Sequence, residues 1–355
     1  MDRTDALREL AFEKKGFDAF LVGSEKNLLY LTGTPGAFCL LIPKKGENTV
    51  FVYGVNYEQT KAEAKGFKVE LLKVGEKLTD RFASLLKSYK IEKIALDALS
   101  YDFYRLLSKG FRGHAKLEVQ SGLIWNLRKV KDEKELQFMR KAGMITGVGM
   151  RAAYETIRPG VTEIEVASEI EYAMRKEGSW GTAFETIVAS GIRSAYPHGG
   201  CENRKIRKGD LVVVDIGSSY EHYNSDMTRT IVAGKPSEKQ EKMFGAVKTA
   251  QEKVYRAIRA KAKAKDVDRI ARKTIQDAGY EQFFVHGLGH GVGLDVHEPP
   301  SLAAASKDRL VVGNVITNEP GVYIPNFGGV RIEDTVLVQE GKAENLTKGP
   351  YTLEA

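Results

Sequence analysis

The chain has 355 residues, of which 42% are apolar and 28% charged, and its formal net charge is +7. This length favours two domains, and the apolar fraction is sufficient for two hydrophobic cores. No run of eighteen apolar residues occurs, so we expect no membrane span, and residues 1–6 lack the pattern of a signal peptide. Most basic residues have acidic neighbours, which argues against a nucleic-acid surface. Cys39 and Cys201 are too few for a disulfide framework, so we expect a cytoplasmic protein.

The first third of the chain alternates strand and helix patterns, which is typical of an α/β layer domain. We expect strands at 18–22, 37–42, 49–53, 68–72 and 93–96, and helices at 27–31, 56–65 and 78–89. No catalytic constellation and no Gly-rich phosphate loop occurs in this region. Residues 1–124 are therefore predicted to form an N-terminal α/β domain without a chemical site of its own.

The second domain is predicted to comprise residues 125–355 and to begin with helices. Three capping boxes mark helix starts: Asp132 with Glu135, Thr162 with Glu165, and Ser237 with Gln240. They predict helices over 133–157, 163–177 and 238–263, followed by a fourth over 266–278. Residues 184–189 are predicted to form a strand that leads into a loop.

Two acids follow a buried strand near the middle of the chain. Residues 211–214 form an unbroken apolar run that ends at Asp215, and a Gly- and Ser-rich turn is predicted over 216–219 before the chain returns to Asp226. Two carboxylates facing each other across a hairpin repel unless a cation lies between them. For this stretch alone, an ordinary polar turn with solvated acids is an equal alternative.

An internal duplication favours the interpretation of these acids as metal ligands over that of a solvated polar turn. Residues 312–321 align with 208–217, so that Glu319 matches Asp215, and Glu333 then matches Asp226. The preceding helices also match at a constant offset, with Tyr154, Ile157, Arg158, Val166 and Gly178 on Tyr255, Ile258, Arg259, Val267 and Gly279. Two such halves packed together bring four carboxylates to one point, which requires more than one metal ion.

A histidine-rich segment supplies a fifth candidate ligand, His290. Five of the six histidines lie between positions 198 and 297, and glycines surround His290 in Gly287-Leu-Gly-His-Gly291. One histidine with four carboxylates makes an oxygen-rich site that suits Mn²⁺, Co²⁺ or Fe²⁺ better than a structural Zn²⁺. Two divalent ions neutralise the four acids, and a bridging water then loses a proton easily.

The order Asp215, Asp226, His290, Glu319, Glu333 resembles the dinuclear metallopeptidases of the pita-bread fold. The segments 194–199, 224–230, 287–291 and 329–334 are most similar to the Xaa-Pro dipeptidase (prolidase) and aminopeptidase P branch. The resemblance covers residues from about 126 to the C-terminus. It implies a creatinase/prolidase-like α/β domain followed by an α+β catalytic domain with duplicated, pseudo-twofold pita-bread architecture.

The resemblance also implies roles for the ligands. Asp226 and Glu333 would bridge two metal ions, Asp215 would bind one ion, and His290 and Glu319 would bind the other. Glu319 would also carry the proton from water to the leaving nitrogen.

Three further residues receive catalytic roles from the resemblance. His297 would donate to the scissile carbonyl oxygen. His198 would lie near the proline nitrogen or the substrate carboxylate. Arg331 would orient Glu333 or reach the substrate carboxylate. His286 and His222 are expected to be structural or to contribute to a pocket rim.

The predicted function is metal-dependent hydrolysis of the Xaa-Pro bond in dipeptides, in a cytoplasmic homodimer. The expected cofactors are two divalent ions per subunit, Mn²⁺ or Co²⁺ first, with Fe²⁺ or Zn²⁺ as alternatives. The substrate is a small peptide with proline at its second position. Aminopeptidase P activity on longer peptides is one alternative, and a metal-free binding module of the same fold is another. The segment Trp180-Gly-Thr-Ala183 differs from the sequence usual in this branch, which leaves the pocket shape and the substrate preference open.

Overall fold

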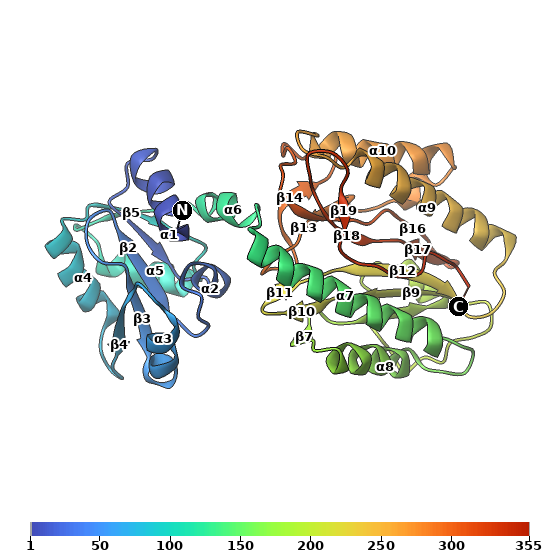
Figure 1. Ribbon diagram of the computed structural model, residues 1–355, viewed down its shortest axis with the longest axis horizontal. Helices are drawn as coiled ribbons and strands as arrows, with labels where there is room; N and C mark the ends of the chain where they lie inside the picture. Colours follow the sequence, from blue (N-terminus) through green and yellow to red (C-terminus); the bar gives the residue numbers. More distant parts are fainter. Residues whose placement is uncertain (1, 355) are drawn as a thin grey trace. The chain divides into compact units, whose positions relative to one another are not determined.

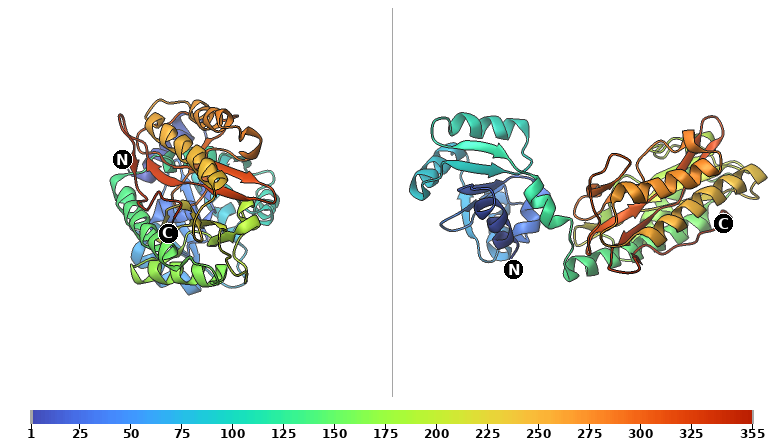
Figure 2. Two further views of the ribbon diagram at one scale, coloured as in Figure 1. Left: turned by 90° about the vertical axis from the view of Figure 1, so that its right-hand side faces the viewer. Right: turned by 90° about the horizontal axis from the view of Figure 1, so that it is seen from above.

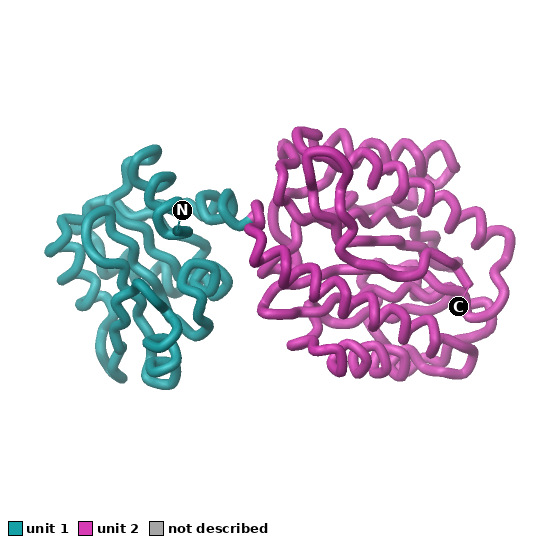
Figure 3. Tube along the Cα trace, viewed as in Figure 1, with its two compact units in different colours: residues 1–128 teal, residues 129–355 magenta. Residues whose placement is uncertain are grey.

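The computed structural model describes residues 2–354, and the chain divides into two compact units, residues 1–128 and 129–355 (Figure 3). The boundary expected at 124/125 falls inside helix α6 (Gly122–Arg128), which the sequence analysis did not anticipate. Among the described residues, every helix is too short or too polar to cross a membrane.

Unit 1 is an α/β layer domain. Within the described residues its sheet has six strands in the order β4-β3-β2-β1-β5-β6, and the pairs are parallel except β1–β2 and β2–β3. The strands are β1 (Ala19–Val22), β2 (Cys39–Pro43), β3 (Thr49–Tyr53), β4 (Lys68–Leu72), β5 (Lys93–Leu96) and β6 (Lys116–Val119). The other helices of this unit are α1 (Arg3–Arg8), α2 (Glu25–Thr32), α3 (Tyr57–Glu63), α4 (Leu78–Tyr89) and α5 (Tyr101–Gly110).

Unit 2 consists of two halves that repeat one another. Its helices are α7 (Glu133–Thr156), α8 (Glu163–Lys176), α9 (Glu238–Ala257) and α10 (Ala264–Asp277). The first half adds β7 (Gly181–Thr182), β8 (Ile187–Ser190), β9 (Leu211–Ile216), β10 (Ser218–Tyr220), β11 (Tyr223–Asn224) and β12 (Met227–Val232). The second half adds β13 (Gly289–Gly291), β14 (Glu298–Leu302), β15 (Val315–Asn318), β16 (Gly321–Ile324), β17 (Gly328–Arg331), β18 (Asp334–Leu337) and β19 (Glu344–Asn345).

The strands of unit 2 lie between the two helix pairs. In Figure 1 the pair α7–α8 (green) lies on one side and the pair α9–α10 (gold to orange) on the other, and the left view of Figure 2 shows the same order. Each pair has its own hydrophobic core, one built on Ile145 and Val166 and the other on Val247 and Val267. This arrangement confirms the predicted fold class, an α/β domain followed by a duplicated pita-bread domain.

The three predicted capping boxes are all present, at the starts of α7, α8 and α9. One predicted helix end is wrong, because α9 stops at Ala257 instead of continuing to residue 263. Ile258 has extended backbone angles and is buried in the core. The repeat in the first half behaves identically, since α7 stops before an extended, buried Ile157. In both halves the helix thus ends where this isoleucine packs into the hydrophobic core.

The turn predicted at residues 216–219 is also wrong. Ser218–Tyr220 is strand β10, and the chain reverses at Glu221 and His222, which both have positive φ angles (48° and 68°). Tyr220 pairs with Tyr223 across this two-residue loop. Two residues with positive φ match the right-handed twist of a hairpin, so the reversal occurs later than the glycine and serines suggested.

Candidate metal centre

Antiparallel pairing brings the predicted acids to one place. Thr228 lies opposite Asp215 in the β9–β12 pair, so Asp226, two residues earlier in the chain, lies beyond the end of that pair. The backbone N–H of Glu333 donates to the carbonyl oxygen of Thr228 at 3.0 Å, which joins the second half to the first. Ligand atoms of Asp226, His290 and Glu333 lie within 4.8 Å of one another.

A cavity of about 580 Å³ opens onto these residues. All eight predicted site residues line it: Asp215, Asp226, His290, Glu319, Glu333, His198, His297 and Arg331. His286, expected to be structural or at a rim, lines it as well. His222 is not among the lining residues and makes an edge-to-face contact with Trp180, with ring centroids 5.0 Å apart.

The imidazole of His290 presents a lone pair to the acids. Its Nδ1 lies 3.0 Å from the carbonyl oxygen of Gly291, and because a carbonyl only accepts, Nδ1 carries the proton. Burial lowers the pKa of His290 to about 4, so the ring is neutral. Its Nε2 therefore carries a free lone pair and lies 3.4 Å from Glu319 Oε1 and 3.7 Å from Asp226 Oδ2. Such an arrangement fits a cation between these atoms.

The carboxylates themselves also fit a cation. Asp215 Oδ1 and Asp226 Oδ1 are buried and have no hydrogen-bond partner among the described residues. Burial, and then the neighbouring carboxylates, raise the pKa values of Asp226 and Glu333 well above their usual range. Burial raises the pKa of Glu319 to about 8. Carboxyl groups with pKa values raised in this way ionise at neutral pH only when a nearby positive charge stabilises the anion.

Arg331 supports Asp215 rather than Glu333. Its Nη2 donates to Asp215 Oδ2 at 2.6 Å, and Nη1 donates to the Tyr323 hydroxyl at 2.7 Å. Nε donates to Thr228 Oγ1 at 3.0 Å, and the Thr228 hydroxyl in turn donates to Glu333 Oε2 at 2.6 Å. The link from Arg331 to Glu333 therefore runs through a threonine. Arg331 is only 3% exposed, and its Nη1 also donates to the carbonyl oxygen of Pro197 at 3.3 Å.

Thr228 and Thr335 occupy equivalent places in the duplication, and each contacts the ligand of the other half. Thr228 donates to the Glu333 side chain, while the Thr335 hydroxyl donates to the carbonyl oxygen of Asp226 at 2.8 Å and accepts from its N–H at 3.0 Å. This reciprocal exchange fixes the two central acids against one another.

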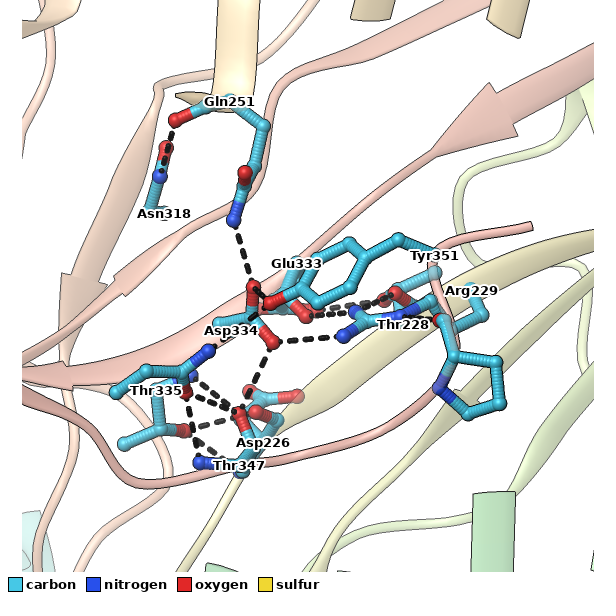
Figure 4. A network of polar contacts seen from close by, with 12 residues as sticks. Asp226, Thr228, Arg229, Gln251, Asn318, Glu333, Asp334, Thr335, Thr347 and Tyr351 are labelled. Carbon is cyan, nitrogen blue, oxygen red and sulfur yellow. Dashed lines mark hydrogen bonds and ion pairs between the residues drawn. The ribbon is translucent and has the colours of Figure 1, made fainter. Parts of the chain in front are cut away.

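A buried arginine lies behind the centre, and sequence reasoning missed it (Figure 4). Arg229 donates to the carbonyl oxygens of Thr228 and Glu333 at 2.9 and 2.6 Å and to Asp334 Oδ1 at 2.8 Å. Its guanidinium lies 4.1 Å from the centre of the Tyr351 ring. The side chains of Arg229 and Asp334 are 1% and 0% exposed. A charged residue inside the strand-like stretch 227–232 (Met-Thr-Arg-Thr-Ile-Val) was the available signal, because an arginine is buried only with a partner.

The two histidines with predicted catalytic roles are exposed at the cavity surface. His297 stacks against His290 with ring centroids 4.0 Å apart. The next residue, Glu298, forms a fully buried ion pair with Lys131 at 2.5 Å. His198 follows Pro197, whose carbonyl oxygen accepts from Arg331 at 3.3 Å. Each imidazole thus follows or precedes a residue that a buried charged side chain contacts, Arg331 for His198 and Lys131 for His297.

Comparison with known proteins identifies a family for each of the two units. The model of the metallopeptidase family M24 matches residues 137–340, and that of the creatinase/prolidase N-terminal domain matches residues 3–130. The chain belongs to metallopeptidase family M24. It is 40% identical over 341 residues to the Xaa-Pro dipeptidase of Pyrococcus horikoshii, an alignment that covers 95% of this chain and 94% of the relative.

Solved structures of M24 peptidases superimpose closely on the chain. The Xaa-Pro dipeptidase from Bacillus anthracis is 35% identical with a TM-score of 0.94, and the match covers 100% of this chain and 99% of that one. The X-Pro aminopeptidase from Thermotoga maritima is also 35% identical, with a TM-score of 0.90 and full coverage of both chains. The predicted family is confirmed. The protein is a metal-dependent peptidase, and its family implies divalent metal ions.

Proposed function

We propose that this M24 peptidase hydrolyses the Xaa-Pro bond of dipeptides. The observation that carries the proposal is the set of four carboxylates and one imidazole that lines a single cavity. The Xaa-Pro dipeptidase from Pyrococcus horikoshii, 40% identical, supplies the substrate class. Similarity to the Thermotoga maritima aminopeptidase keeps longer Xaa-Pro peptides as the second candidate.

We infer two divalent ions, because four carboxylates need about four positive charges. Asp226 and Glu333 would be shared between the ions, Asp215 would hold one, and His290 with Glu319 would hold the other. Oxygen-rich ligands favour Mn²⁺ or Co²⁺, with Fe²⁺ and Zn²⁺ as alternatives. When bound, such ions polarise the scissile carbonyl and make water more acidic.

The chain's own groups then move the protons and hold the substrate. Glu319 takes a proton from the attacking water and passes it to the proline nitrogen as the C–N bond breaks. This transfer is needed because the imide nitrogen of an Xaa-Pro bond has no hydrogen and leaves only when protonated. His297 donates to the carbonyl oxygen as negative charge develops there. Partial burial lowers the pKa of His297, so it donates as a neutral imidazole.

The free carboxylate of a dipeptide needs a donor, and His198 is the remaining candidate. Arg331 is almost fully buried and bound to Asp215, Tyr323 and Thr228, which leaves it little capacity for a substrate. His198 is exposed and lines the cavity. We therefore assign carboxylate recognition to His198 and support of Asp215 to Arg331.

Hydrolysis of Ala-Pro, Ala-Pro amide and Ala-Pro-Ala tests the proposal. The protein is first treated with chelator and then reloaded with Mn²⁺ or Co²⁺. Ala-Pro should be cleaved only after reloading, and amidation should raise KM by about 10- to 100-fold, as for loss of a charge-assisted contact. Comparable kcat/KM for all three peptides would assign aminopeptidase P activity instead. Absence of both metal uptake and hydrolysis would indicate a metal-free binding module.

We further propose a cytoplasmic homodimer that contacts neither nucleic acid nor membrane. Support for the compartment comes from the two cysteines, which are both free. Support for the dimer comes from the family resemblance alone, and sedimentation of the purified protein tests it.

A further inference from the structure

One wall of the cavity contains a bulge between β7 and β8. The N–H of Ala183 donates to the carbonyl oxygen of Gly217, and Ile187 lies opposite Asp215. The five residues 183–187 thus run alongside only three residues, 215–217. The longer segment therefore has to bulge out of the regular strand. Consecutive residues of a regular strand point to opposite faces, yet Phe184 and Glu185 both line the cavity.

Glu185 differs from every other charged residue of the cavity wall. Five more charged side chains line it, and all of these belong to the metal centre: Asp215, Asp226, Glu319, Arg331 and Glu333. Among the described residues of this wall, Glu185 is the one charged side chain that is exposed, and no hydrogen bond or ion pair is seen for it. Divalent cations would neutralise the four acids of the centre, and Asp215 already pairs with Arg331. Within the described part of this wall, the carboxylate of Glu185 then remains without a cationic side chain paired to it.

Apolar side chains also line the cavity. Phe184, Ile187 and Val296 line the same cavity. A side chain with a long methylene stem and a terminal cation suits such a wall, because the stem packs on apolar groups while the cation stays near solvent and a carboxylate.

We propose that Glu185 is a specificity-determining residue that favours lysine or arginine before the proline. The inference rests on the proposed Xaa-Pro activity and names the preferred class of its substrate. Glu185 contacts none of the reacting atoms in this scheme. It attracts the cationic end of the Xaa side chain and so raises kcat/KM for basic dipeptides over neutral ones of similar length.

The test compares Lys-Pro, Met-Pro and Ala-Pro as substrates of the metal-loaded full-length enzyme. In Glu185→Gln, the kcat/KM ratio of Lys-Pro to Met-Pro should fall by about two- to fivefold, the range of a solvent-exposed ion pair. In Glu185→Lys, the ratio should fall further, and Glu-Pro should become a better substrate than in the wild type. The wild-type ratio should also decrease as NaCl is raised, because salt screens an exposed pair.

The matched control is Glu169→Gln, which removes an exposed acid of helix α8 away from the cavity and should leave the ratio unchanged. A uniform loss for all three dipeptides in Glu185→Gln would overturn the inference, because it would place Glu185 at the common N-terminus or in the fold. An unchanged ratio in both Glu185 variants would overturn it too, while leaving Xaa-Pro hydrolysis intact. A wild type that cleaves none of the dipeptides would overturn the proposed function together with this inference.

Discussion

Arg331 Nη2 and Asp215 Oδ2 form an ion pair of 2.6 Å, through which the arginine orients a candidate metal ligand. Arg331→Lys should therefore lower metal affinity by about 10- to 100-fold, the usual cost of losing a residue that orients a ligand. The KM ratio of Ala-Pro amide to Ala-Pro should stay constant in this variant at saturating metal. If that ratio collapses instead, Arg331 contacts the substrate carboxylate.

Asp226 and Glu333 should each be indispensable. Asp226→Asn or Glu333→Gln removes a negative charge that we assign to both metal ions, so activity should fall by more than about 100-fold and the bound metal should drop below two ions per chain. Elemental analysis and Ala-Pro hydrolysis measure both effects. The control Asp277→Asn alters an exposed acid of α10 and should change neither. Near-normal activity with two ions bound would refute the shared-ligand assignment.

Glu319→Gln separates proton transfer from metal binding. An amide oxygen can still coordinate an ion, but it cannot accept a proton from water. We expect kcat, normalised to measured metal content, to fall by about 100-fold or more. If normalisation to metal content restores the wild-type value, Glu319 acts only as a ligand.

The metal-free protein should lose stability as the pH rises. Burial raises the pKa of Glu319 from 4.5 to about 8, so the folded state binds more protons than the unfolded state between these values. Its contribution to stability is complete below pH 4.5 and is lost as the pH rises through about 8. The melting temperature of chelated protein should therefore fall from pH 5 to pH 8. This fall should be smaller in Glu319→Gln and in metal-loaded wild type. A melting temperature that rises over this range would contradict the prediction.

Asp334→Asn should unfold the catalytic domain more easily, because it leaves the buried charge of Arg229 without its counter-ion. Breaking a buried pair in this way costs about 3–5 kcal/mol in the free energy of unfolding. Removing an exposed pair with Lys242→Met should change it by less than about 1 kcal/mol. Urea unfolding measures both variants, and a cost below about 1 kcal/mol for Asp334→Asn would show that the pair contributes little.

Local signals in the sequence were sufficient for much of the fold. The capping box at Thr162 and Glu165 identifies the start of α8 because it satisfies backbone donors within one turn. The end of α9 was missed because Ala260 permits a helix where the first half has Pro159, which does not. The duplication itself could have corrected this, since Ile157 and Ile258 are equivalent and both are extended.

Side-chain partners were harder to predict than the site. The spacing of the acids and the duplication identify the candidate ligands, but spacing does not reveal which ligand an arginine contacts. Arg331 was expected to orient Glu333, which lies two residues away on the same strand face, or to reach the substrate carboxylate. The bond to Asp215 instead depends on how the two halves pack, and no local pattern encodes this. Arg229 was overlooked although its place in a strand-like stretch was a local signal, and that signal does not identify its partner Asp334.

Because the catalytic domain is duplicated, metal binding should affect how cooperatively its two halves unfold. Each helix pair of the catalytic domain packs on its own hydrophobic cluster, although Leu211 and Val232 of the first half belong to the cluster of the second. The candidate ligands are divided between the halves, with Asp215 and Asp226 on one and His290, Glu319 and Glu333 on the other. Ions held between them bind only while both halves are folded and in register, and binding to the native state alone stabilises it. Bound metal thus adds to the coupling that the Thr228–Glu333 hydrogen bond and the buried Arg229–Asp334 pair already provide between the halves, and chelation should weaken that coupling.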